Sequence, residues 1–287
     1  MSNASSMGIY ARYYSLKKIS ITDIQQMYGV FQRYYDNTDL DTFLKDISRK
    51  SGAILVRSKE DDRVVGFSTI VSMDMTVGER RGKGIFSGDT IIERDYWGSR
   101  ALQTCFARLM LWEKLRSPHK PVFWLLISKG YKTYLLLANN FKRYYPNPDN
   151  RDIELDQVVQ LYCEQMFPGS RDPLGLLQFG DGAQRLRDEV AGISEELRQQ
   201  YPKIRYFETR NPTWKVGTEL PCVGVVCART LSSFALKALR NPQTGAAATN
   251  AEKPAAIVRP ARRSPPNHTP NITSVAGTNA SSAGALQ

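Results

Sequence analysis

The hydrophobic and polar positions of the chain follow two alternating patterns. An unbroken apolar run at 121–128, bounded by Pro and by Lys-Gly, is typical of a fully buried central strand. After Gly98, apolar residues recur at helical spacing and predict an amphipathic helix that Pro118 ends. These positions are Leu102, Cys105, Phe106, Leu109 and Trp112.

Similar patterns predict the remaining elements. Further strands are expected at 11–19, 53–56, 64–73, 85–92, 204–210 and 221–228. Further helices are expected at 23–36 with Thr22 as cap, at 40–50, at 131–141 and across much of 150–203, where the best helix has Leu186, Val190, Ile193 and Leu197. Strands that pair early and cross over by helices later imply an α/β fold, a mixed sheet with helices on both faces.

The two ends of the chain differ from the middle. From 241 to 287 Ala, Pro, Ser, Thr, Asn and Gly dominate without apolar periodicity, so a disordered tail is expected. Residues 1–9 are treated as a disordered start. The expected organisation is therefore a single domain over 10–240, with a helical insertion at about 150–203.

Composition narrows the class of protein. No apolar run approaches the roughly 18 residues of a membrane span, and the start lacks a signal-peptide stretch, so a cytoplasmic protein is expected. The four cysteines form no C-x-x-C pair and the two histidines lie far apart. Buried, reduced thiols and no metal site are the prediction.

The net charge of +11 indicates anionic partners. Nucleic acid, nucleotide-like cofactors such as coenzyme A, acidic carrier proteins and anionic membrane surfaces all fit that charge. The basic residues do not gather on one helix and no nucleic-acid-binding motif occurs, which argues against nucleic acid.

The segment after the strand at 85–92 has the features of an anion site. It leads through Gly98 into a helix, whose first backbone N–H groups and dipole attract anions. Arg94 and Arg100 add positive charge. The same residues also fit an ordinary strand-to-helix turn with solvated arginines.

The element order and two segments, DTIIERDYWGSRALQ (89–103) and FWLLISKGYKTYLLLANNF (123–141), resemble the GNAT superfamily of N-acyltransferases. The resemblance covers roughly 10–145 and resumes near 204–230. It implies a fourth strand leading into a loop that holds the pyrophosphate of coenzyme A, and a fifth strand that splays from the fourth. The pantetheine arm would lie in the gap.

The resemblance also implies ligand-binding residues. Those expected to bind acyl-coenzyme A (acetyl or longer) are Arg94, Trp97, Gly98, Ser99, Arg100, Ala101 and, for pantetheine, Ser128. The family loop carries several glycines, whereas here one remains and Arg100 stands where a glycine is expected. A coenzyme A donor and an acyl carrier protein donor both stay open.

Catalysis in the family implies direct attack of an amine on the thioester. Asp89 and Glu93 are the candidate bases, and a bulge at Gly88 would aim a backbone N–H at the carbonyl. Tyr134, then Tyr131, are the candidate proton donors for the thiolate. The plainer alternatives are an Asp89 paired with a nearby cation and tyrosines that only pack.

The sequence thus predicts an acyltransferase acting on a small-molecule amine with a coenzyme A or carrier-protein thioester. Two alternatives remain: a GNAT-like binding module without activity, and a basic nucleic-acid-binding protein.

Overall fold

A computed structural model describes residues 8–36, 38–179, 185–186, 192–227 and 230, the pair 185–186 by backbone alone. The first strand begins at Ile9, inside the stretch expected to be a disordered start. The expected tail at 241–287 lies outside the described residues.

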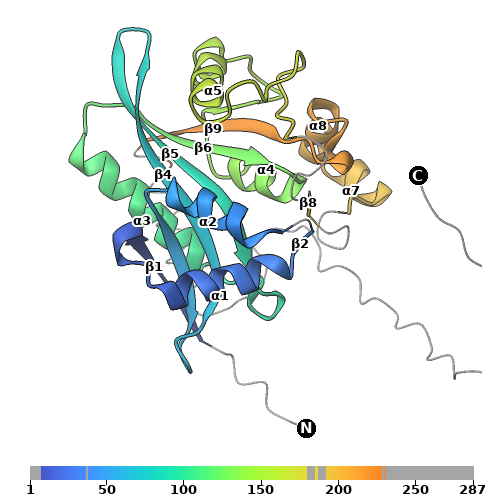
Figure 1. The fold of residues 1–287 in the computed structure, drawn as a ribbon. Coiled ribbons are helices and arrows are strands. Elements are labelled where there is room, and N and C mark those ends of the chain that lie inside the picture. Colours follow the sequence, from blue (N-terminus) through green and yellow to red (C-terminus); the bar gives the residue numbers. More distant parts are fainter. Residues whose placement is uncertain (1–7, 37, 180–184, 187–191, 228–229, 231–287) are drawn as a thin grey trace, which may run out of the picture. The chain divides into compact units, whose positions relative to one another are not determined.

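Seven strands form one mixed sheet in the order β1-β3-β4-β5-β6-β9-β7 (Figure 1). They are β1 (Ile9–Ser15), β3 (Gly52–Ser58), β4 (Val64–Val77), β5 (Arg80–Ile92), β6 (Val122–Ser128), β9 (Leu220–Val226) and β7 (Tyr144–Tyr145). All neighbours are antiparallel except β5 and β6, which are parallel. A separate pair joins β2 (Tyr35–Asp36) to β8 (Arg185–Leu186).

Helices cover both faces of the sheet. The described helices are α1 (Ile21–Gln32), α2 (Leu40–Ser48), α3 (Ala101–Arg116), α4 (Tyr131–Ala138), α5 (Ile153–Met166), α7 (Glu195–Gln200) and α8 (Pro202–Arg210), with short 3-10 turns at Leu16–Lys18, Arg94–Tyr96 and Trp214–Val216. Alternation along the strands separates two sides of the core. Trp124 and Leu126 of β6 pack with α3 and α4, whereas Phe123 and Leu125 pack with α5. Helices α1 and α2 lie on the same face as α5 (Figure 1). The expected α/β fold is therefore confirmed.

Two strands separate near the middle of the sheet. β5 and β6 pair only from Lys83 and Val122 as far as Ser87 and Leu126. β5 then continues to Ile92, still paired with β4 but no longer with β6. One edge of β5 therefore loses its neighbouring strand beyond Ser87, as expected of the gap between these strands.

A β-bulge lies at the same point, as the sequence suggested. Ser68 pairs with Thr90 and Ile70 with Ser87, so Thr69 faces both Gly88 and Asp89. A Cβ at position 88 would lie 2.4 Å from Thr69 Oγ1, so the close approach requires glycine there.

The strand expected at 204–210 is instead α8. Pro202 occupies the first turn of this helix, where proline is favoured, and Ile204 and Phe207 are buried three residues apart. The spacing of these two residues is helical, and the sequence interpretation missed it because it weighted the alternating apolar residues instead.

Several smaller expectations are also corrected. Ser20, rather than Thr22, caps α1: its hydroxyl accepts from the Asp23 N–H at 3.1 Å. Leu186 lies in β8 and not in a helix. The strand expected at 85–92 begins earlier, at Arg80, so that two residues separate β4 from β5. Trp112 does not join the buried stripe of α3 and is 59% exposed. In the described part of the chain, every helix is too short or too polar to cross a membrane.

Candidate active site

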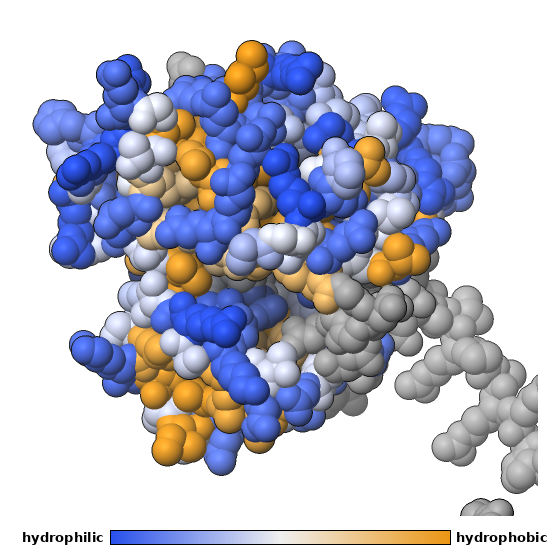
Figure 2. Space-filling view, turned by 45° about the horizontal axis from the view of Figure 1, so that its top comes forward, coloured by the Kyte–Doolittle hydropathy of each residue, from blue (hydrophilic) through white to orange (hydrophobic). Residues whose placement is uncertain are grey.

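A cavity of about 650 Å³ lies where β5 and β6 separate. A hollow crosses this side of the molecule, with hydrophilic and hydrophobic side chains at its rim (Figure 2). Its walls come from the end of α1 and from α2, from β5 and β6, from the start of α4 and from the loop after α5. The lining includes Tyr35, Asp39, Asp46, Lys50, Phe86, Asp89, Trp97, Ile127, Lys129, Tyr131, Lys132, Phe167, Phe179 and Glu219.

A buried ion pair forms one wall. The antiparallel register of β6 and β9 places Ser128, the last residue of β6, opposite Leu220, the first residue of β9. Lys129, which follows Ser128, therefore meets Glu219, which precedes Leu220. The Lys129 Nζ accordingly lies 3.3 Å from the Glu219 Oε1, and Glu219 is only 3% exposed. Lys129 Nζ also lies 5.0 Å from the centroid of the Tyr35 ring. The pair brings one fixed cation into the cavity.

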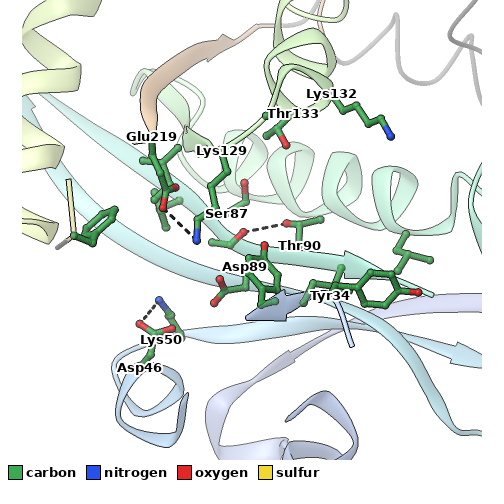
Figure 3. A pocket seen from close by; sticks show the side chains of 18 of the residues that line it. Tyr34, Asp46, Lys50, Ser87, Asp89, Thr90, Lys129, Lys132, Thr133 and Glu219 are labelled. Atoms are coloured by element: carbon green, nitrogen blue, oxygen red, sulfur yellow. Dashed lines mark hydrogen bonds and ion pairs between the residues drawn. The ribbon is translucent and has the colours of Figure 1, made fainter. Parts of the chain in front are cut away.

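Asp89 lies beside this pair, on the bulged part of β5 (Figure 3). It is half-buried, and burial raises the pKa of its carboxyl, while the Lys129 and Lys50 ammonium groups oppose that rise. Burial likewise raises the pKa of the Glu219 carboxyl, against the effect of Lys129. Burial lowers the pKa of the Lys129 ammonium, but Glu219, with Tyr35 and Asp89, outweighs it and the net shift is upward. Two carboxyls of raised pKa therefore share one ammonium group.

The opposite wall is more polar and belongs to α2. The Lys50 Nζ lies 2.7 Å from the Asp46 Oδ1, and this pair faces Asp89 across the cavity (Figure 3). Asp39, at the start of α2, adds another carboxylate, which accepts from the Thr42 N–H at 2.8 Å. This side therefore carries an excess of negative charge.

The other end of the cavity is cationic. Trp97 has the Lys132 Nζ 5.2 Å and the Arg94 Cζ 5.8 Å from its ring. Burial and Arg94 lower the pKa of the Lys132 ammonium. Trp97 belongs to the loop that leads into α3, where the N-cap residue Arg100 makes no side-chain capping bond. Lys132 lies in the first turn of α4, whose N-cap residue also makes none. Uncapped N–H groups and these cations together favour an anionic group here.

The loop residues expected to bind coenzyme A follow Trp97 in the chain. Gly98, at φ 88, takes the left-handed conformation that lets the loop turn into α3. The Ser99 hydroxyl accepts from the Ala101 N–H at 3.2 Å, and Arg100 is the N-cap residue of α3. Of the predicted loop residues, Trp97 lines the cavity itself.

Glu93 does not lie in the cavity, so it is not placed to act as a base there. It is 6% exposed and forms ion pairs with Arg33 at 2.5 Å and with Arg63 at 2.8 Å. Glu93 directly follows Ile92, the last residue of β5, and its carboxylate is held by Arg33 and Arg63.

Tyr134, the first choice as proton donor, also lies outside the cavity. It is fully buried, donates its hydroxyl to the Pro146 carbonyl at 3.0 Å and packs against Phe207 of α8. Tyr131 does line the cavity, and burial raises the pKa of its phenol. Ser128 is fully buried at the end of β6 and is not part of the lining.

The structure adds residues that the sequence interpretation missed. Lys129, Glu219, Asp46 and Lys50 were not singled out, although Lys129 and Glu219 each border a buried apolar strand. A charge directly at the end of such a run is the signal that could have identified both. Within the described ranges, no three His, Cys, Asp or Glu side chains gather as a metal site would require.

No family model and no curated protein matches the chain. Solved structures do match at low identity. A probable N-acyltransferase from Enterococcus faecalis V583 is 10% identical with a TM-score of 0.35, over 45% of this chain and 31% of that chain. An acetyltransferase from Trypanosoma brucei is 14% identical with a TM-score of 0.33, over 51% of this chain and all of that chain.

A GCN5-related N-acetyltransferase from Kribbella flavida is 15% identical with a TM-score of 0.32, over 50% of this chain and 34% of that chain. The match thus spans about a third of the Enterococcus and Kribbella chains. An overlap of this size assigns no activity to this chain.

Proposed function

We propose that this protein is an acyltransferase, which moves an acyl group from a coenzyme A thioester to a primary amine by direct attack. One observation carries the proposal. Where β5 and β6 separate, a carboxylate of raised pKa, Asp89, faces a cavity whose far end is cationic. The cationic end suits the anionic nucleotide of a coenzyme A thioester. The acidic side suits a basic amine.

The donor would lie along the opened edge of β5. Among the described residues, no strand pairs with this edge beyond Ser87, so its peptide groups suit the amides of a pantetheine arm. The phosphates would lie near Trp97, Lys132 and Arg94, at the uncapped starts of α3 and α4. This end supports coenzyme A over a carrier-protein donor, because the Lys132 Nζ and the Arg94 Cζ lie 5.2 and 5.8 Å from one ring, that of Trp97.

The acceptor would enter from the acidic side formed by α2. Its nitrogen attacks the thioester carbonyl carbon, a C–N bond forms and the C–S bond breaks. Asp89 takes the proton that the attacking amine loses, and Tyr131 gives a proton to the departing thiolate. No covalent enzyme intermediate is required.

The environment of Asp89 suits a base. Burial raises the pKa of its carboxyl, which strengthens it as a proton acceptor, and Lys129 opposes that rise. As a consequence, kcat/KM falls as the pH drops through the raised pKa of Asp89.

The test is thiol release from acetyl- and octanoyl-coenzyme A in the presence of a panel of primary amines. Asp89→Asn should reduce kcat by about a hundredfold or more and remove the acidic limb of the pH profile. Asp74→Asn is the matched control, since the Asp74 side chain is 90% exposed on β4 and outside the cavity, and it should leave kcat unchanged. Equal turnover of the two variants would refute the role of Asp89.

A further inference from the structure

We infer that the acyl group is a hydrophobic chain longer than acetyl, held against an aromatic wall at the α5 side of the cavity. This inference rests on the proposed function, since it describes the donor of the same reaction. The wall consists of Phe86, Ile127, Phe167 and Phe179, and is called the aromatic wall below.

The aromatic wall is continuous. The ring centroids of Phe86 and Phe167 are 5.7 Å apart, and those of Phe167 and Phe179 are 5.4 Å apart. Phe86 is 2% exposed, whereas Phe179 is 37% exposed, so the row leads from the core outward. A single exposed phenylalanine needs no explanation, but a row that borders a cavity offers apolar surface to a ligand.

The loop that carries Phe167 and Phe179 is fixed in place. Leu177 and Glu219 exchange two backbone hydrogen bonds at 2.9 and 3.0 Å, which tie the loop to the start of β9. The Gln178 N–H also donates to the Ser170 carbonyl at 2.8 Å. The wall is therefore preformed and would lose little entropy when a chain binds.

The position of the aromatic wall indicates that the acyl group, rather than the acceptor, binds against it. Phe86 directly precedes Ser87, the last residue of β5 that pairs with β6, and Ile127 directly follows the corresponding residue of β6. The wall therefore begins where the thioester would lie. The acceptor side instead carries the carboxylates of Asp39 and Asp46, which favour a cation over an apolar group.

The size of the cavity agrees with a longer chain. A volume of about 650 Å³ falls within the range of roughly 300–1,000 Å³ that holds a drug-sized ligand. An acetyl group would leave the aromatic wall exposed to water, whereas each methylene placed against it removes apolar surface from water.

The experiment measures binding of N-acetylcysteamine thioesters with acetyl, butyryl, hexanoyl and octanoyl groups, which carry a chain but no phosphate. We expect the affinity to rise about fourfold per methylene, equivalent to about 0.8 kcal/mol. Phe179→Ala should weaken octanoyl binding by about tenfold and leave acetyl binding unchanged. Ile127→Trp, which fills the start of the wall, should likewise weaken only the longer chains.

Phe106→Ala is the matched control, because Phe106 packs against Trp124 on the other face of the sheet. It should leave the dependence on chain length intact. Equal affinity for all four thioesters, or an equal loss for every chain in Phe179→Ala, would overturn the inference. The affinity for these thioesters could rise with acyl length while coenzyme A esters do not bind at all. That result would support the aromatic wall as the acyl site and refute coenzyme A as the donor.

Discussion

Replacing Lys129 by methionine removes an ammonium group that both cavity carboxyls, Glu219 and Asp89, share. Lys129 Nζ lies 3.3 Å from the Glu219 Oε1, and burial raises the pKa of both Glu219 and Asp89. Methionine keeps much of the volume and the apolar stem of lysine. The substitution therefore tests the charge rather than the packing.

The expected loss of stability is large. At 3.3 Å and an effective dielectric constant of about 20, the attraction between two unit charges is about 5 kcal/mol. Removing one partner of a buried pair typically costs about 3–5 kcal/mol, because the other charge stays buried. We expect Lys129→Met to lose about that much free energy of unfolding at pH 7.5.

The loss should depend on pH with a defined sign. Without Lys129 the pKa values of Glu219 and Asp89 rise further above their unfolded values, so the folded protein binds more protons than the unfolded chain. Its stability then falls as the pH rises from the unfolded carboxyl pKa through the folded one. The deficit of Lys129→Met against the parent protein should be small near pH 4.5 and largest above neutrality.

Urea unfolding at pH 4.5 and pH 7.5 measures both quantities. Lys18→Met is the control, because Lys18 is exposed in a 3-10 turn, and it should change the stability by less than about 0.5 kcal/mol. Adding Glu219→Gln to Lys129→Met should restore part of the loss. A deficit below about 1 kcal/mol, or an equal deficit at the two pH values, would refute the coupling of these groups.

Two further predictions separate the tyrosines of α4. Tyr134→Phe should lower the free energy of unfolding by about 1 kcal/mol, since the hydroxyl bonded to the Pro146 carbonyl is lost, and should leave kcat unchanged in the thiol-release assay. Tyr131→Phe should lower kcat by about a hundredfold with little change in the urea midpoint, and equal kcat values for the two variants would remove Tyr131 from the reaction.

The pattern of the chain was sufficient for most of the sheet. The apolar run that forms β6 and the spacing that forms α4 identify a buried strand followed by a helix, because both patterns are set by local burial. The bulge at Gly88 also follows locally, from a glycine between polar residues in an otherwise apolar strand. The strand predicted at 204–210 is wrong, because the helix that forms there buries Ile204 and Phe207 in the same cluster as α4.

The cavity wall was harder to predict, because it depends on contacts between distant segments. Lys129 and Glu219 meet only through the antiparallel register of β6 and β9, about 90 residues apart in the chain. Tyr134 and Tyr131 share one apolar stripe in the sequence, so spacing alone left open which of them would face the core and which the cavity. Asp89 could be predicted as a candidate because it lies in a strand that the local pattern of residues 85–92 already indicates.

Thermal unfolding with and without coenzyme A tests the central claim most directly, since it asks whether the cationic end of the cavity binds the donor. At 100 times its dissociation constant coenzyme A should stabilise the fold by about 2.7 kcal/mol, which raises the midpoint by about 5–10 °C for a domain of this size. Lys132→Glu should abolish that rise, because it reverses a charge beside Trp97. No rise in the parent protein, or the same rise in Lys132→Glu, would contradict a coenzyme A-dependent acyltransferase site in this cavity.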